Sequence, residues 1–370
     1  MARRERVADR LPTFPWDRLS EYKTTAAAHP DGLVDLSVGA PADPVPQGLR
    51  AALAEAADAP AYPATYGTPE LRESIAGWLH RQHGVTVDPA ATLPTTGSKE
   101  LVAWLPTLLG LGAGDTVVYP ELAYPTYDVG VRLAGAAPVA SDGVTSLGPA
   151  PVSLVWINSP ANPTGRVLGT EHLRKVVEWA RERGAIVASD ECYIDLGWDG
   201  VQPRSVLHPD VCGGSHEGLL ALHSLSKRSN LAGYRAASVA GDPDLVAELL
   251  AVRKHAGMIV PAPVQAAMRA ALDDDEHARE QRERYAARRA RLRAALEEAG
   301  WVITHSEAGL YLWAHHPDHA DAWESVAALA KQGILAAPGD FYGTAGRRNV
   351  RLALTATDER VAAAAARLAG

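Results

Sequence analysis

A lysine lies among hydroxyl and guanidinium groups in the segment Ser224–Arg235, which reads SLSKRSNLAGYR. The apolar run Leu219–Leu222 precedes it, so Lys227 is expected just beyond the end of a buried strand. Serine hydroxyls and an arginine can hold a phosphate, and a lysine amine beside them can form a Schiff base. This combination points to pyridoxal 5'-phosphate (PLP). A solvated surface lysine would fit the same segment, so other residues must decide.

A carboxylate follows a second apolar strand. Asp190 comes after residues 185–189, and the carboxyl end of a parallel strand is where α/β sheets bind ligands. Paired with the pyridine nitrogen of PLP, this carboxylate would keep the ring protonated and electron-withdrawing. Tyr193 could hydrogen-bond the phenolic oxygen of the cofactor. The alternatives are a carboxylate that caps the next turn and a half-buried tyrosine with its hydroxyl in water.

Two further loops could complete such a site. Asn162 lies in the turn-forming segment Asn158–Gly165, from which a side-chain amide could reach the same phenolic oxygen, although a plain loop also fits. Gly97 and Ser98 open a predicted helix, whose free N–H groups could bind a phosphate while Gly97 allows close approach. The second signal is weak by itself, because many helices begin with Gly-Ser.

The elements that must position these groups alternate along the chain as in an α/β fold, with a mostly parallel central sheet flanked by helices. The patterns predict strands at Leu33–Val38, Asp115–Tyr119, Val152–Ile157, Ala185–Ser189, Leu219–His223 and Ala236–Ala240. They predict helices at Leu49–Ala57, at Glu70–Arg81 and from Thr170 to Gly184, besides the one that Gly97 opens.

The chain is expected to form a large PLP-binding domain and a smaller α+β domain. Residues 1–40 would be an N-terminal arm and part of the small domain, residues 41–272 the large domain, and residues 273–370 the rest of the small domain. A long charged helix follows the acidic run 273–275, and its many arginines are expected to form a solvated face. Strands are predicted within 301–313 and 350–354, before a last helix from Asp358.

Composition limits the function classes. The 370 residues carry a net charge of −8, which argues against nonspecific binding to nucleic acid or anionic membranes. The two cysteines indicate no disulfide framework, and no apolar stretch approaches a membrane span, so we expect a soluble cytoplasmic protein. No metal site is expected, because the histidines of 315–319 surround a Pro-Asp turn and lack a second ligand set.

Taken in order, these segments resemble the fold-type I, class I/II aminotransferases over roughly 300 residues. The ordered set is Tyr62-x4-Gly67, Gly97-Ser98-Lys99, Ala123-Tyr124-Pro125, Asn162-Pro163-Thr164-Gly165, Asp190-x2-Tyr193, Ser224-x2-Lys227-x7-Arg235 and Arg351. No single piece is specific, but the ordered combination is.

The resemblance implies a role for each residue. Lys227 would be the catalytic Schiff-base lysine, and Asp190 would partner the pyridine nitrogen. The remaining cofactor contacts would come from Asn162 and Tyr193 at the phenolic oxygen, Tyr124 stacked on the ring, and Ser98, Lys99 (through its backbone), Ser224, Arg235 and a neighbouring subunit's Tyr62 at the phosphate. Gly39, Asn162 and Arg351 would bind the substrate, with Arg351 as a bidentate fork for the α-carboxylate. The resemblance also implies a homodimer whose active sites are shared between the subunits.

More of the chain is similar to the N-succinyldiaminopimelate aminotransferases of lysine and diaminopimelate biosynthesis. The similar segments read LPTFPWD from Leu11, GSKELVAWLP from Gly97, VLHPDVCGG from Val206 and RKHAGM from Arg253. Amino transfer between N-succinyl-LL-2,6-diaminopimelate and 2-oxoglutarate is implied, with Lys99, Arg18, Lys254 and His255 as candidates for the distal carboxylate. The alternatives are an aminotransferase for aspartate, LL-diaminopimelate or aromatic or methionine-type amino acids, and a PLP-dependent lyase.

Overall fold

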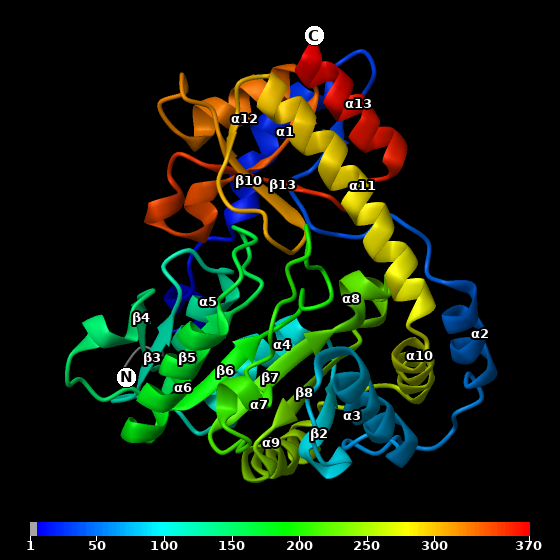
Figure 1. Cartoon of the computed structure of the whole chain (residues 1–370), viewed down its shortest axis with the longest axis vertical. Coiled ribbons are helices and arrows are strands. Elements are labelled where there is room, and N and C mark those ends of the chain that lie inside the picture. The colour runs from blue at the N-terminus through cyan, green and yellow to red at the C-terminus, as the bar shows by residue number, and fades with distance from the viewer. Residues whose placement is uncertain (1–5) are drawn as a thin grey trace.

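The computed structural model describes residues 6–370, so residues 1–5 of the expected arm lie outside the described residues. The larger part of the molecule surrounds a seven-stranded sheet, and a smaller part with a four-stranded sheet sits above it in Figure 1. The long helix α11 (Glu276–Glu298) runs from one part to the other along the edge of the molecule. Within residues 6–370, no helix has both the length and the apolar character that a bilayer span requires.

The large sheet is mixed and mostly parallel, as expected. Its order is β2 (Thr92–Thr95), β8 (Ala237–Gly241), β7 (Leu219–Ser224), β6 (Ile186–Asp190), β5 (Leu154–Asn158), β3 (Thr116–Tyr119) and β4 (Ala137–Ala140). Only β8 runs antiparallel to its neighbours. The sequence did not predict β2 and β4, which each contain a proline, Pro94 and Pro138. Both are edge strands, where a missing N–H donor is tolerated.

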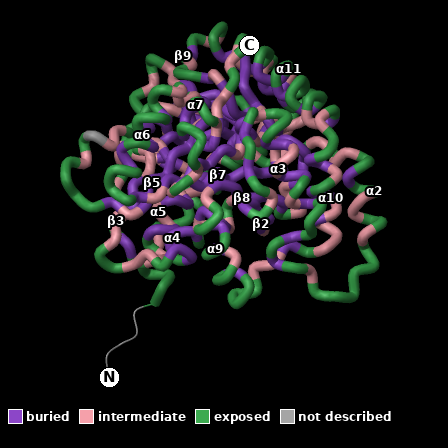
Figure 2. The backbone as a smooth tube through the Cα atoms, turned by 60° about the horizontal axis from the view of Figure 1, so that its bottom comes forward, coloured by how far each residue is buried: buried purple, intermediate pink, exposed green. Residues whose placement is uncertain are grey.

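Helices cover the large sheet, and its central strands β5, β6, β7 and β8 are largely buried (Figure 2), whereas the edge strand β4 is partly exposed. Those of the larger part are α2 (Gln47–Glu55), α3 (Pro69–His83), α4 (Ser98–Leu108), α5 (Thr126–Ala134), α6 (Thr170–Arg183), α7 (Pro209–Cys212), α8 (Leu225–Arg228), α9 (Pro243–Ala256) and α10 (Ala262–Asp273). Helix α3 begins where the Thr68 side chain accepts a hydrogen bond from the N–H of Leu71 and ends at the left-handed Gly84. The predicted helices therefore exist, with ends shifted by one or two residues.

The smaller part joins the two ends of the chain. Its sheet is β12 (Ala337–Pro338), β13 (Val350–Ala353), β10 (Tyr311–His315) and β9 (Val302–Ile303), and β1 (Val34–Asp35) pairs with β11 (Ile334–Leu335). The remaining helices are α1 (Ser20–Ala27), α12 (Ala322–Lys331) and α13 (Asp358–Ala369). Leu19, Val34 and Leu36 share one apolar core with residues of the C-terminal segment. Residues from both ends of the chain therefore pack together, and the division at 40/41 and 272/273 stays a prediction.

Two local predictions need correction. The strand predicted at Leu33–Val38 pairs only through Val34 and Asp35, because the carbonyls of Ser37 and Gly39 instead accept hydrogen bonds from site side chains. Two arginines of α11 are buried rather than solvated: Arg288 pairs with Asp43 and Asp358, and Arg289 pairs with Asp199. A helix that packs along both parts of the molecule turns these side chains toward acidic partners from distant segments.

Candidate active site

Polar side chains meet where neighbouring strands of the large sheet end. Asn158 closes β5, Asp190 closes β6 and Ser224 closes β7. The strand register places Asn158 beside Asp190, and the Asn158 amide donates to the Asp190 main-chain carbonyl at 2.9 Å. Because parallel strands present their carboxyl ends at one edge, residues distant in sequence are brought together here.

The Asp190 carboxylate is buried without a cation. It accepts hydrogen bonds from the Tyr127 hydroxyl at 2.8 Å and the Cys192 N–H at 3.2 Å. Burial raises the pKa of Asp190, and these hydrogen bonds oppose the rise. Among residues 6–370, no basic side chain forms an ion pair with it. A cationic ring nitrogen would relieve the cost of burying this charge.

The Lys227 amine lies between the two parts of the molecule. The short helix α8 carries it immediately after β7, and its Nζ donates to the Gly39 carbonyl of the N-terminal segment. Burial lowers the pKa of Lys227, and the positive charges of Arg351 and Arg235 lower it further. A neutral amine is both a nucleophile and a base, so this lysine is suited to covalent and proton-transfer chemistry.

Arg235 lies against the N-terminus of α4. Gly97 precedes that helix with φ +88°, and a Cβ atom there would overlap the Arg235 guanidinium. Glycine is therefore required for close approach as well as for conformation. The combination of free helix N–H groups and a guanidinium makes a site for an anion such as a phosphate.

Arg351 lies across the site in a buried setting. One guanidinium nitrogen donates to the Asn162 side-chain oxygen at 2.9 Å and another donates to the Ser37 carbonyl at 2.7 Å. Its guanidinium stacks on Tyr311, 3.9 Å from the ring centroid. A Cβ atom on Gly39 would overlap the Tyr311 hydroxyl, so glycine is needed at that position too. The planar cation is thus oriented for a carboxylate.

The other predicted residues fall into two groups. Tyr193, Tyr124 and Ser224 lie in or beside the site, as does Ser98. The Tyr193 hydroxyl is 3.0 Å from that of Tyr311, Tyr124 packs edge-on against Tyr127, and the Ser224 hydroxyl caps α8. Ser98 opens α4 next to Gly97. Two predicted side chains lie outside the cluster of Asp190, Lys227 and Arg351: Tyr62 is 99% exposed, and the Lys99 amine lies 5.9 Å from the Phe14 ring centroid. The distal candidates Arg18 and Lys254 contact Asp340 and Tyr66 respectively.

Sequence reasoning missed three tyrosines of the site, Tyr127, Tyr311 and Tyr342. Tyr127 is fully buried and stacks on Trp156, with ring centroids 5.0 Å apart, while its hydroxyl holds Asp190. Its position in the first turn of α5, three residues after Tyr124, was the available signal. The other two come from the small sheet and the turn before β13, and no local pattern links them to the site.

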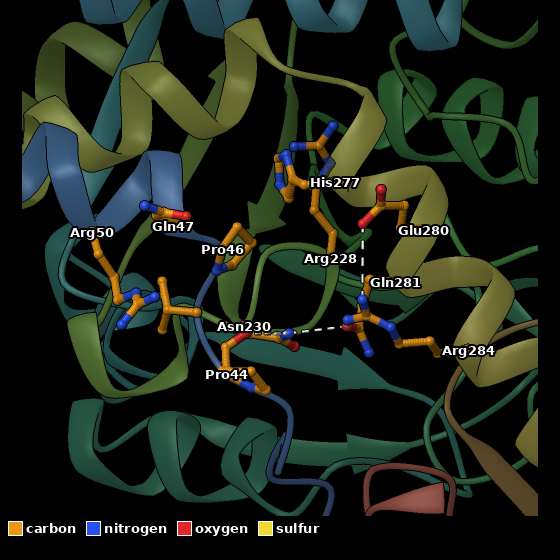
Figure 3. A pocket seen from close by; sticks show the side chains of 11 residues that line it. Pro44, Pro46, Gln47, Arg50, Arg228, Asn230, His277, Glu280, Gln281 and Arg284 are labelled. Carbon is orange, nitrogen blue, oxygen red and sulfur yellow. Dashed lines mark hydrogen bonds and ion pairs between the residues drawn. The ribbon is translucent and has the colours of Figure 1, made fainter.

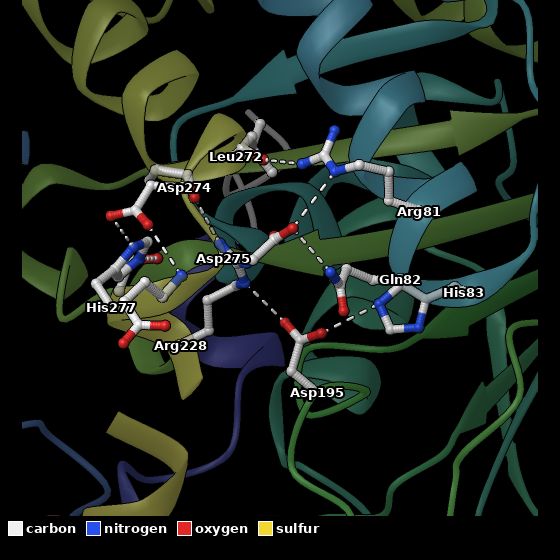
Figure 4. Close-up of polar contacts among 12 residues, drawn as sticks. Arg81, Gln82, His83, Asp195, Arg228, Leu272, Asp274, Asp275 and His277 are labelled. Carbon is white, nitrogen blue, oxygen red and sulfur yellow. Dashed lines mark hydrogen bonds and ion pairs between the residues drawn. The ribbon is translucent and has the colours of Figure 1, made fainter. Parts of the chain in front are cut away.

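Ion pairs of Arg228 anchor the segment that carries Lys227. The Arg228 guanidinium bonds Asp195 at 2.9 Å and Asp275 at 3.3 Å, and Asp195 also contacts His83 (Figure 4). The positive charge of Arg228 and the hydrogen bond with His83 hold the pKa of Asp195 well below its usual value, against the opposing effect of burial. These contacts fix the backbone on which Lys227 stands.

A pocket of about 190 Å³ opens on the far side of this segment and does not include Lys227 (Figure 3). Asn230, Gln281 and Arg284 line it, and the Asn230 amide donates to Gln281 at 3.0 Å. It is therefore separate from the cluster of Asp190, Lys227 and Arg351.

The cluster fits the expected cofactor. PLP requires three features that are present here: a buried carboxylate without a cation, an amine with a lowered pKa and an anion site beside Gly97. Asp190 would hold the ring nitrogen, Lys227 would carry the aldehyde carbon, and Arg235 with the α4 N-terminus would hold the phosphate.

Comparison with known proteins agrees with this geometry. Residues 31–368 match the family described as aminotransferase class I and II. A probable aminotransferase of Mycobacterium tuberculosis, Rv1178, is 64% identical over 98% of this chain and 86% of its own length. The 4-dedimethylamino-4-oxo-anhydrotetracycline transaminase OxyQ of Streptomyces rimosus is 62% identical over 97% and 99% of the two chains. The solved N-succinyldiaminopimelate aminotransferase of M. tuberculosis has a TM-score of 0.87 at 28% identity, covering 99% of both chains.

Proposed function

Because the chain belongs to the class I and II aminotransferases, a PLP-dependent family, we propose that it transfers the amino group of N-succinyl-LL-2,6-diaminopimelate to 2-oxoglutarate. The products would be N-succinyl-2-amino-6-oxopimelate and glutamate. The observation that carries the chemistry is the buried Lys227 amine, which donates to the Gly39 carbonyl and whose pKa is lowered by burial.

Each residue has a defined task in this proposal. PLP supplies an electron sink that lets a bound amino acid lose its Cα proton. Arg351 binds the α-carboxylate and fixes the substrate's orientation, as its contacts with Asn162 and Tyr311 fix the guanidinium itself. Lys227 would carry the proton from Cα to the cofactor in the first half-reaction, and would carry a proton back to Cα of the new amino acid in the second. Asp190 keeps the ring nitrogen protonated, and Tyr127 orients that carboxylate.

The proposed amino donor rests on the chain's likeness to the solved M. tuberculosis enzyme of that name and on the cation at the edge of the site. Lys99 is the second residue of α4, beside the proposed phosphate site, and its exposed amine reaches toward Phe14 of the N-terminal arm. A distal carboxylate of the succinylated donor could pair with this amine.

A second candidate is transamination of a bulky cyclic ketone. OxyQ, which is 62% identical to this chain, is named for such a substrate. The N-terminal arm also brings Phe14 and Trp16 together with Phe341 and Tyr342, and flat ring systems pack well against aromatic side chains.

We also propose a cytoplasmic homodimer with shared sites. Tyr62 is 99% exposed and Trp104 on α4 is 40% exposed, and large exposed aromatics mark interaction surfaces. The free cysteines Cys192 and Cys212 fit a reducing compartment. Mixing inactive Tyr62→Ala and Lys227→Ala subunits should restore part of the activity through hybrid dimers that contain one intact site. A fully active monomer in sedimentation would contradict the shared site.

Initial rates of the PLP-loaded protein with 2-oxoglutarate test the substrate proposal. The proposal expects the highest kcat/KM for N-succinyl-LL-2,6-diaminopimelate, against aspartate, alanine, phenylalanine and LL-diaminopimelate as donors. Preference for a short or aromatic donor would contradict the substrate and leave the aminotransferase assignment intact. Elimination products without glutamate formation would favour a lyase.

A further inference from the structure

Two aromatic side chains beside the proposed site have polar atoms without a partner. The hydroxyl of Tyr342 and the indole N–H of Trp16 are inaccessible to solvent and form no hydrogen bond with any described residue. Tyr342 is only 3% exposed. A buried donor without an acceptor costs about 1–3 kcal/mol, so such groups require an explanation.

Both side chains adjoin the group that would bind the substrate carboxylate. The Tyr342 ring centroid lies 4.8 Å from the Arg351 guanidinium carbon. The Trp16 ring meets the Tyr342 ring edge-on, with centroids 6.4 Å apart. A substrate anchored at Arg351 would therefore extend along these two rings.

The two rings are held firmly. The Tyr342 carbonyl accepts the Ala123 N–H at 2.8 Å, and a Cβ atom on the next residue, Gly343, would overlap the Glu121 carbonyl. Trp16 packs between Phe14 and Phe341. The arm that carries it is fastened by Arg18, which pairs with Asp340 at 3.2 Å and lies over the Trp323 ring. The backbone segments that carry the two rings are thus held in place, and a bound substrate needs only small side-chain movements to reach the two donors.

Neighbouring donors of the same type do have partners. In the same aromatic cluster, the Trp323 indole N–H donates to Asp340 at 2.9 Å. The Tyr311 hydroxyl is bonded to Tyr193 on the other side of Arg351. Within this aromatic cluster, the missing acceptors therefore distinguish Trp16 and Tyr342, although the indole N–H groups of Trp78 and Trp156 elsewhere in residues 6–370 also lack a partner.

We propose that Tyr342 and Trp16 form a side-chain subsite that binds an acceptor oxygen, such as a carbonyl, on the substrate carbon chain anchored at Arg351. This subsite rests on the proposed function, because it takes Arg351 as the carboxylate anchor. It selects substrates whose apolar body lies against aromatic rings and carries an oxygen that can accept two hydrogen bonds. Burial raises the pKa of Tyr342, so its hydroxyl remains protonated and able to donate at neutral pH.

Binding of two matched carboxylates to the PLP-loaded protein tests the subsite without turnover. Hexanoate and 5-oxohexanoate have the same chain and differ by one carbonyl oxygen, and calorimetric titration gives the Kd of each. The wild type should bind 5-oxohexanoate about 30-fold more tightly, the value of two net hydrogen bonds. Tyr342→Phe and Trp16→Phe should each reduce this ratio about threefold or more, whereas Trp323→Phe, a control whose N–H already has a partner, should keep it.

The outcomes separate the subsite from the proposed function. A wild-type ratio near one, or a ratio unchanged in both variants, overturns the subsite. If the preference for 5-oxohexanoate is lost in Tyr342→Phe but kept in Trp16→Phe, Tyr342 belongs to the subsite and Trp16 does not. Arg351→Lys should weaken both ligands equally, and if it does not, the anchor assignment fails whatever the ratio shows.

Discussion

The two sides of the candidate site differ in how completely their polar groups are paired. On the cofactor side, formed by Asn158, Asp190, Lys227 and Arg235, each side chain is held by strand register or by a hydrogen bond. The substrate side, formed by Trp16, Tyr342 and Arg351, retains donors with no partner among residues 6–370: the Trp16 indole N–H, the Tyr342 hydroxyl and Arg351 Nε.

This difference corresponds to what each side is proposed to bind. A resident cofactor needs one fixed geometry, so its ligands are themselves oriented by neighbours, as Tyr127 orients Asp190. An exchanging substrate must supply hydrogen bonds that only the correct ligand completes, and unpaired donors then discriminate against other ligands. Specificity should therefore change through the substrate side, while the chemistry depends on the cofactor side.

The largest effect is expected at the cofactor side. Lys227→Ala should lower kcat by about 10⁴-fold or more, because a positioned base alone contributes about 10²–10⁴-fold and the covalent attachment is lost as well. PLP should still bind noncovalently, as equilibrium dialysis would show. A variant that retains more than a tenth of wild-type activity would remove Lys227 from the mechanism, and Lys175→Ala at a surface ion pair serves as control.

Arg351→Lys tests the anchor on the substrate side. An ammonium cannot form the planar fork, so kcat/KM should fall by about 10- to 100-fold for every amino donor alike. Arg348→Lys, on an exposed neighbour, should change nothing. If the loss differs strongly between donors, Arg351 contacts the side chain instead of the shared α-carboxylate.

Tyr127→Phe is expected to have a smaller effect, again on the cofactor side. Removing the hydroxyl leaves one Asp190 oxygen without its 2.8 Å partner, so PLP affinity and kcat should each fall by about tenfold, the usual effect for a hydrogen bond to a charged group. The matched variant Tyr119→Phe removes a hydroxyl that bonds Asp128 outside the site. Equal effects of the two changes on PLP affinity would show that Tyr127 has no positioning role.

The smallest effect is expected for Lys99→Ala at the edge of the substrate side. An exposed charge pair contributes about 0.2–1 kcal/mol, so KM for N-succinyl-LL-2,6-diaminopimelate should rise two- to fivefold while PLP affinity stays constant. Alanine, which lacks a distal carboxylate, should be unaffected. A similar rise for alanine would exclude a distal role.

The cofactor side could be predicted from the sequence, whereas most of the substrate side could not. The cofactor side lies at strand ends and helix starts, where apolar runs and a glycine give local signals, so Asp190, Lys227 and Gly97 were identified before the structure. Trp16 and Tyr342 belong to the arm and to the turn before β13, and only tertiary packing brings them together. Edge strands with proline and the buried arginines of α11 were missed for related reasons, since partners from distant segments override local pattern.

Borohydride reduction of the PLP-loaded protein, followed by peptide mapping, tests the central claim most directly. The chain has six lysines, so the position of the fixed cofactor distinguishes Lys227 from five alternatives. The expected result is a single reduced adduct, stoichiometric with the chain, on the peptide that contains Lys227. An adduct on any other lysine, or none at all while PLP remains bound, would contradict the assignment of this site.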